Sequence, residues 1–171
     1  TAVLSPESTA FFLCLHGAKH QWRRLMWIAD LAYLLERRPA FDWERLFRLA
    51  QDFHFERMVN VGLSLAWQVM GLQLPVEAHR RLSLDPQAER LSAQVQQRTL
   101  VERQNLATGD DIRFYLQARE RLRDRLYYVF DQAFVPKQAD WLNSPLPPGL
   151  YGLYYLVRPF RVAVKVGRGR V

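Results

Sequence analysis

Apolar side chains recur at helical spacing along most of the chain, whereas stretches of alternating polarity are scarce. The segment Ser5-Pro6-Glu7 is typical of a helix start, because serine caps, proline fits the first turn and an acid favours the positive helix end. Comparable signals predict further helices over residues 23–37, 42–53, 55–70, 75–84, 85–105, 110–134 and 150–157. The sequence therefore predicts an all-α fold, a bundle of about seven to eight helices.

The segment 55–70 has an unusual pattern for a helix. Its polar positions fall four residues apart, at Glu56, Asn60, Ser64 and Gln68, and the rest of the segment is largely apolar. On a helix this spacing gives one narrow polar stripe, so the cylinder needs apolar neighbours on most sides. We predict that this helix is the central one.

The region after residue 135 has a different composition. Prolines interrupt it, and the closing stretch VAVKVGRGRV alternates like a strand without a partner strand in the sequence. Proline disfavours continuation of a helix, so the helix over 150–157 is expected to end before Pro159. We predict a helical bundle over residues 1–135, followed over 136–171 by a Pro-rich connection, a short helix and a basic tail.

The charge balance favours anionic partners. Lys and Arg number 24 against 17 Asp and Glu, for a formal net charge of +7 and a sequence pI near 10.0. Such a charge attracts nucleotides, or nucleic acid weakly and with strong salt dependence. No apolar run approaches the roughly 20 residues that span a bilayer. The opening TAVLSPEST lacks the features of a signal peptide. We therefore predict a cytoplasmic protein with no membrane partner.

Candidate chemistry concentrates in residues 13–35. His16 and His20 lie four apart, which is a metal-ligand spacing on a continuous helix, but no third ligand follows them closely. Helix capping or hydrogen-bonded packing is the alternative for both histidines. A third interpretation is an anion site, in which Lys19, His20 and the pair Arg23-Arg24 donate hydrogen bonds to phosphate.

Two tryptophans and one aspartate complete this segment. Trp27 falls on an apolar helical stripe, which favours core packing, whereas Trp22 has polar neighbours and is a candidate for stacking on a base. Asp30 is the lone charge between Leu25 and Leu35. Because an unpaired buried charge is costly, Asp30 either faces solvent or pairs with a basic neighbour.

Other catalytic signatures are weak or absent. Arg48 and His54 have the R-x5-H spacing of helical HEPN ribonucleases, although Leu49 stands where those enzymes place a polar residue. The sequence contains no P-loop, no G-x-S-x-G and no clustered carboxylates of the kind that two-metal phosphoryl chemistry requires. We predict no catalytic residue and no metal ligand in this chain.

The segment HGAKHQWRRLMWIAD, residues 16–30, entered through Ser5-Pro6-Glu7, resembles a bacterial family of uncharacterised nucleotidyltransferases. FDWERLFRLA at 41–50, the stretch 136–141 and LPPGLYGLYYLVRPFR at 146–161 are also similar to that family.

The resemblance implies that the catalytic domain lies upstream, where a Gly-Ser loop and aspartates hold Mg²⁺ and the NTP. This chain then corresponds to the helical C-terminal part, which is inactive alone and has the upstream domain as its partner. Carried over onto the matching positions, nucleotide or acceptor contacts are expected at His16, Lys19, His20, Trp22 and Asp30. The alternatives are a non-catalytic helical module that binds nucleic acid or protein, and the HEPN-like ribonuclease.

Overall fold

The computed structural model describes residues 4–101, 108–136 and 147–167, without the side chains of 99–101, 108–111, 148 and 165–167. All regular structure in these ranges is helical, which confirms the predicted all-α class. Nine α-helices are present there, one more than expected because the helix predicted over 110–134 is divided in two. Among the described residues, no helix has the length and apolar composition needed to cross a membrane.

The helices begin and end where local chemistry directs. Ser5 accepts a hydrogen bond from the Ser8 N–H at 3.2 Å, and Asp42 accepts one from the Arg45 N–H at 2.9 Å. Gly71, in the left-handed conformation, ends the central helix. The first helices are α1 (Pro6–Lys19), α2 (Leu25–Glu36), α3 (Trp43–Phe53), α4 (Glu56–Met70), α5 (Val76–Ser83) and α6 (Pro86–Val101). There follow α7 (Thr108–Ala118), α8 (Leu122–Phe134), the 3-10 helix η1 (Pro148–Leu150) and α10 (Leu153–Gly167).

Residue contacts divide the chain into two compact units. The first comprises residues 1–105 and 114–120, and the second comprises 106–113 and 121–171. The predicted domain boundary after residue 135 stays a prediction.

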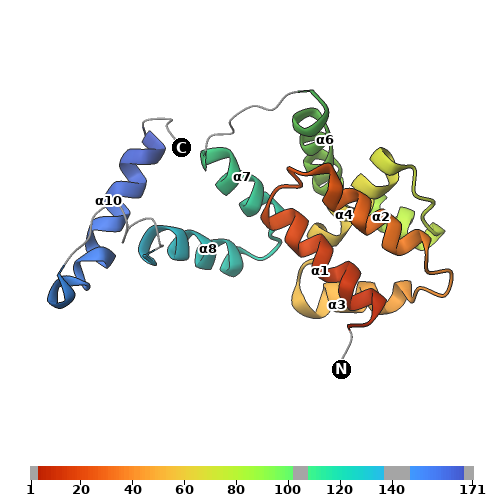
Figure 1. The fold of residues 1–171 in the computed structure, drawn as a ribbon, viewed down its shortest axis with the longest axis horizontal. Coiled ribbons are helices and arrows are strands. Elements are labelled where there is room, and N and C mark those ends of the chain that lie inside the picture. The colour runs from red at the N-terminus through yellow and green to blue at the C-terminus, as the bar shows by residue number, and fades with distance from the viewer. Residues whose placement is uncertain (1–3, 102–107, 137–146, 168–171) are drawn as a thin grey trace. The chain divides into compact units, whose positions relative to one another are not determined.

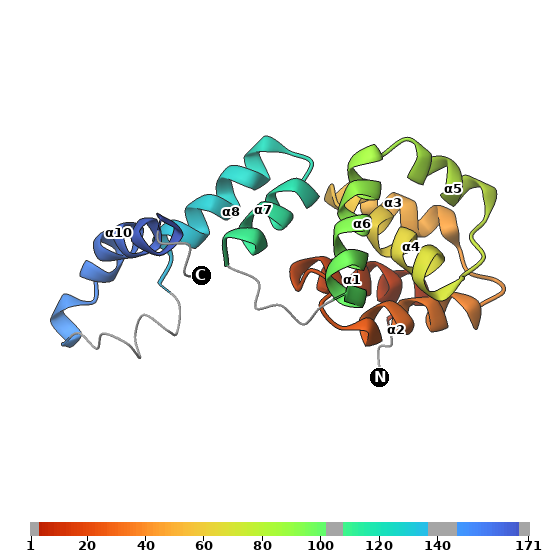
Figure 2. The same cartoon turned by 90° about the horizontal axis from the view of Figure 1, so that it is seen from above.

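The first unit is built around α4, which packs against α1, α2, α3, α5 and α6. Figure 1 and Figure 2 show the helices of this unit gathered around it. Its residues are buried without interruption from Met58 to Ala66, which confirms the predicted central position. Cys14 of α1 is also buried here, and burial raises the pKa of its thiol, so the sulfur stays protonated.

The polar stripe of α4 forms a seam with α6. Three contacts along the two helices join Asn60 to Asp85 at 3.3 Å, Ser64 to Ser92 at 3.0 Å, and the amide of Gln68 to that of Gln96. The residue numbers rise on both sides of the seam from one pair to the next, so α4 and α6 run in the same direction. α5 lies in the connection between them. The stripe therefore pairs polar groups of the two helices, from the buried Ser64–Ser92 contact to the exposed Gln68–Gln96 contact at the surface.

The single helix predicted over 110–134 is wrong. Residues 119–121 interrupt it, because tertiary contacts of Arg119 and Glu120 hold this stretch in another conformation. Apolar residues that recur at helical spacing in its second half lie exposed on α8: Leu122, Leu126, Val129 and Phe130.

The predicted end of the last helix before Pro159 is wrong as well. α10 contains Pro159 and continues to Gly167, so residues 162–167 are helical and not a strand. Proline removes one backbone hydrogen bond, while the helical turns on both sides keep theirs. The basic tail from residue 168 onward lies outside the described residues.

The buried position of α4 leads to a stability prediction. Leu63→Ala should lower the free energy of unfolding by about 2–5 kcal/mol, because a fully buried leucine leaves a cavity when truncated. Val76→Ala, at an exposed position of α5, is the matched control and should change it little. Urea unfolding of both variants measures the difference. Equal midpoints would contradict the central position of α4.

Candidate functional site: a histidine and tryptophan patch

The turn between α1 and α2 has a strained backbone. Gln21 and Trp22 both have positive φ, 54° and 53°, which side chains other than glycine rarely adopt. The N–H of Trp22 donates to the carbonyl of Gly17 at 2.8 Å and folds the chain back onto α1. Such conformations persist only where the surrounding structure holds them, and they are common at functional sites.

Trp22 is held by the core and does not face a ligand. Its side chain is 0% exposed, and a Cβ on Gly17 would lie 2.6 Å from three of its ring atoms. The expected base-stacking face of Trp22 is thus covered by protein. Its buried Nε1 has no hydrogen-bond partner in the described part of the chain, so the turn is stabilised by packing.

Trp27 is half-buried: it packs against the core, as predicted, and its ring also contacts two histidines of α1. Its ring lies 5.2 Å from that of His16 in an edge contact and 5.3 Å from that of His20. The two imidazoles are 4.7 Å apart, and Phe12 stacks on His16 at 5.9 Å. We call these four side chains, Phe12, His16, His20 and Trp27, the His-Trp patch.

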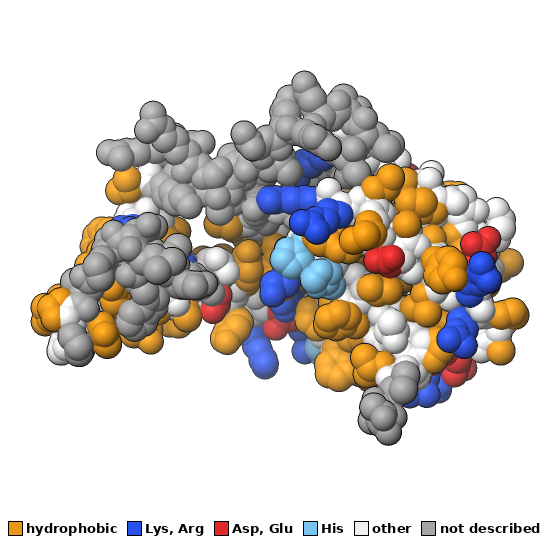
Figure 3. Space-filling view, viewed as in Figure 1, with side chains coloured by type: hydrophobic (Ala, Val, Ile, Leu, Met, Phe, Trp, Pro, Cys, Tyr) orange, Lys and Arg blue, Asp and Glu red, His pale blue; other side chains and the backbone are white. Residues whose placement is uncertain are grey.

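Basic side chains surround the His-Trp patch. The Arg24 guanidinium lies 5.8 Å from the centre of the Trp27 ring, and Lys19 and Arg23 are exposed beside His20. Figure 3 shows histidine side chains on this face, with Lys, Arg and hydrophobic side chains around them. Flat rings and cations together favour a planar anionic ligand.

The protonation of His20 follows from its neighbours. Partial burial lowers its pKa, and the positive charges of His16, Lys19, Arg23 and Arg24 lower it further. At neutral pH His20 is therefore uncharged, with one ring nitrogen able to accept a hydrogen bond and the other able to donate one.

Asp30 does not join this site. Its side chain is exposed, and it makes no ion pair with any described residue, so solvent screens its charge. Of the two arrangements considered for Asp30, the solvent-facing one is observed. Among the described residues, no three His, Cys, Asp or Glu side chains lie close enough to hold a metal ion.

Arg48 and His54 do not contact each other within the described chain. Arg48 is exposed and pairs with Glu44 at 3.3 Å, and His54 is the left-handed cap residue that ends α3. The ribonuclease alternative stays a prediction that no described contact favours.

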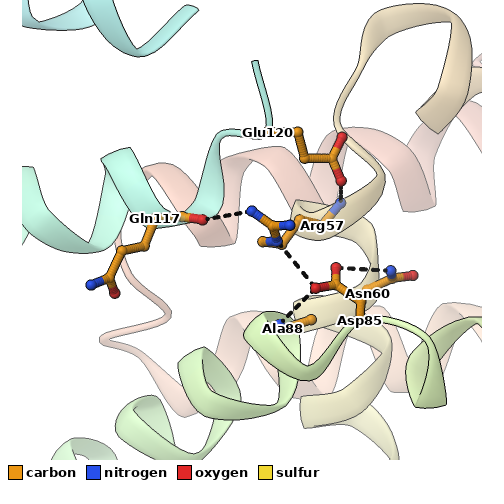
Figure 4. Close-up of polar contacts among 6 residues, drawn as sticks. All are labelled: Arg57, Asn60, Asp85, Ala88, Gln117 and Glu120. Atoms are coloured by element: carbon orange, nitrogen blue, oxygen red, sulfur yellow. Dashed lines mark hydrogen bonds and ion pairs between the residues drawn. The ribbon is translucent and has the colours of Figure 1, made fainter. Parts of the chain in front are cut away.

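A second polar location, missed by the sequence analysis, lies where α4 and α6 begin. Figure 4 shows Arg57 at its centre: Nε donates to Asp85 at 3.2 Å and a terminal nitrogen donates to the Gln117 carbonyl at 3.1 Å. Glu120 accepts the Arg57 N–H at 2.9 Å and so caps α4, whose own cap residue, Phe55, provides no side-chain hydrogen bond. A pocket of about 420 Å³ lies here, and Arg57, Asp85, Glu120 and Arg81 border it.

Two carboxyl groups meet in this pocket. Burial raises the pKa of Glu120 to about 7, and its hydrogen bond with Glu56 and the negative charge of Glu56 add to the rise. The Arg57 N–H and the Arg57 charge act in the opposite direction. One Oε of Glu56 is buried without a hydrogen-bond partner among the described residues. The pair is best satisfied when the two groups share one proton.

The fold and the His-Trp patch define a helical bundle with an aromatic, basic surface. A family model described as uncharacterised nucleotidyltransferase matches residues 1–71, which include α1 to α4 and the whole patch. The resemblance to that family is confirmed for this part of the chain, and the similarities proposed for 136–141 and 146–161 lie beyond the match. No curated protein and no solved structure matches the chain.

The shared proton leads to a pH prediction. The folded-state pKa of Glu120 is about 7, above the ordinary value of 4.5. The contribution of Glu120 to the stability of the fold is therefore greatest below pH 4.5 and is lost as the pH rises to about 7. In Glu120→Gln, the amide oxygen can still accept the Arg57 N–H and the amide nitrogen can donate to Glu56. The variant should therefore gain stability relative to the natural chain as pH rises from 4.5 to about 7.

Thermal unfolding across that pH range measures the gain. Glu77→Gln, which removes an exposed glutamate paired with Arg81, is the control and should show no such trend. A difference between Glu120→Gln and the natural chain that stays constant with pH would contradict proton sharing.

Proposed function

We propose that this chain is the helical part of a nucleotidyltransferase, which transfers a nucleoside monophosphate from an NTP to an acceptor. The observation that carries the proposal is the partly exposed His-Trp patch, which lies inside the residues that match the nucleotidyltransferase family. In this proposal Trp27, His16 and His20 present ring faces to a base or a planar acceptor. Lys19, Arg23 and Arg24 supply positive charge for phosphate.

The metal chemistry of this family does not fit the described residues. Mg²⁺ takes oxygen ligands in octahedral geometry, whereas the patch offers imidazole nitrogens and the one nearby carboxylate, Asp30, is exposed away from other donors. We therefore assign Mg²⁺ and the phosphoryl-transfer step to carboxylates outside these 171 residues, in a catalytic domain that would be the partner of this chain. The chain itself binds and orients.

The first test is nucleotide binding by the 171-residue chain. On titration with ATP, the indole N–H resonance of Trp27 should shift in a ¹H–¹⁵N spectrum, because its ring lies in the patch. Trp67 is an internal control because it lies outside the patch. Its ring makes a similar edge contact with the ring of His79, with the ring centres 4.9 Å apart. Lys19→Ala should weaken binding roughly tenfold, the effect of losing about 1.4 kcal/mol, and Arg80→Ala on α5 should not.

Equal shifts at Trp27 and Trp67, or no loss of affinity in Lys19→Ala, would contradict a nucleotide-binding role of the patch. Tight binding of RNA or DNA that survives raised salt would favour the nucleic-acid module instead. Cleavage of RNA that is lost in Arg48→Ala and His54→Ala would favour the ribonuclease.

The second test is nucleotide transfer. The 171-residue chain should transfer no nucleotide, and a protein that also contains the catalytic domain should be active. In that protein, His20→Ala and Lys19→Ala should lower activity while the thermal midpoint stays nearly unchanged, because both side chains are exposed. Asp30→Asn should leave stability unchanged, since its charge is unpaired in the described chain. Transfer by the 171-residue chain alone would contradict the proposal.

A further inference from the structure

The second unit contains a pair of helices with inverted polarity. α8 and α10 pack against each other within this unit, yet each turns polar side chains inward and apolar side chains outward. The most buried positions of α10 are Tyr154 and Arg158, four residues apart, at 3% and 9% exposure. In a water-soluble helix the buried stripe is normally the apolar one.

Arg158 shows how the interior of this pair is satisfied. Its Nε donates to the carbonyl of Gln132 on α8 at 3.2 Å. Burial lowers the pKa of Arg158, while the negative charge of Asp131 on α8 counteracts that shift. Polar groups of the two helices therefore satisfy each other between α8 and α10.

The outward faces carry large apolar side chains. On α8 these include Leu122, Leu126 and Phe130, and on α10 they include Leu156 and Phe160, at 66% and 76% exposure. We call the exposed apolar side chains of these two helices the outer face. An apolar face of this kind marks a surface that another apolar phase or molecule covers.

The charge of this part of the chain decides which kind of partner fits. Residues 121–171 contain nine of the 24 basic residues but three of the 17 acidic ones, so they carry +6 of the formal net charge of +7. Two copies brought together at the outer face would repel each other. An apolar phase with a negative surface matches both features, and the interface of an anionic lipid membrane is such a phase.

We propose that the outer face binds the surface of an anionic lipid membrane, with α10 and its exposed Leu156 and Phe160 at the interface. The inward polarity fits this environment, because hydrocarbon accepts apolar side chains but not unsatisfied polar groups. The exposed tyrosines Tyr127 and Tyr155 suit the headgroup region. α8 and α10 have 13 and 15 residues, fewer than the roughly 20 that a helix needs to span a bilayer. This binding is independent of nucleotide transfer and revises the expectation of no membrane partner.

Vesicle flotation of the 171-residue chain tests the proposal. The chain should float with vesicles of phosphatidylcholine and phosphatidylglycerol, bind pure phosphatidylcholine vesicles much less, and dissociate from the anionic ones as salt is raised. The double variant Leu156→Glu, Phe160→Glu should reduce binding roughly tenfold or more, because two apolar anchors are lost and two negative charges added. Leu84→Glu alters a leucine of the first unit that is 74% exposed, and this control should lose far less affinity.

Four results would overturn it. The first two are no flotation with anionic vesicles and equal binding to both vesicle types. The third is an equal loss of vesicle binding in the double variant and in the control. The fourth is a large fall in the thermal midpoint of the double variant, which would place the outer face inside the protein. Light scattering adds a separate check. A natural chain that self-associates while the double variant is monomeric would assign the outer face to a second copy.

Discussion

Everything in the first unit depends on the burial of α4, a helix that is enclosed along its middle from Met58 to Ala66 and still carries polar side chains. Burial of a polar group without a partner costs more than a typical hydrogen bond returns, so a central helix with a polar stripe needs a neighbour with a matching stripe. α6 provides it through Asp85, Ser92 and Gln96. The seam also sets the register of the two parallel helices, because a shift by one turn would separate all three pairs.

The turn after α1 connects the packing around α4 with the surface of the first unit. Trp22 fills the space between α1 and α4, and it fits because Gly17 and Gly62 present no side chain to its ring. Two residues with positive φ are required to bring it there. Once Trp22 is inside, the following residues start α2 with Trp27 against His16 and His20. The His-Trp patch is thus a consequence of how the core is closed, and its rings are positioned by buried contacts behind them.

The sequence was most informative where local signals and period agreed. The Ser5-Pro6-Glu7 start and the four-residue polar spacing over 55–70 predicted α1 and the central position of α4. It was least informative where long-range contacts decide. Trp22 was wrongly expected at the surface because it lies in a turn with positive φ that directs its ring into the core, which no helical period describes. Glu120 interrupts a predicted helix because its partner, Arg57, lies 63 positions away. On α8 the apolar residues do recur at helical spacing, but periodicity does not tell which side of a helix faces inward.

The bond from Glu120 to α4 also orders events during synthesis. A ribosome delivers the chain from its N-terminus, so α1 to α6 emerge before residue 120 exists. Until then the N–H of Arg57 has water as its partner, and Asp85 holds the Arg57 side chain without the help of the Gln117 carbonyl. Closing a loop of this length carries an entropic cost that local helix formation does not. The cap of the central helix can therefore form only after residue 120 has been made.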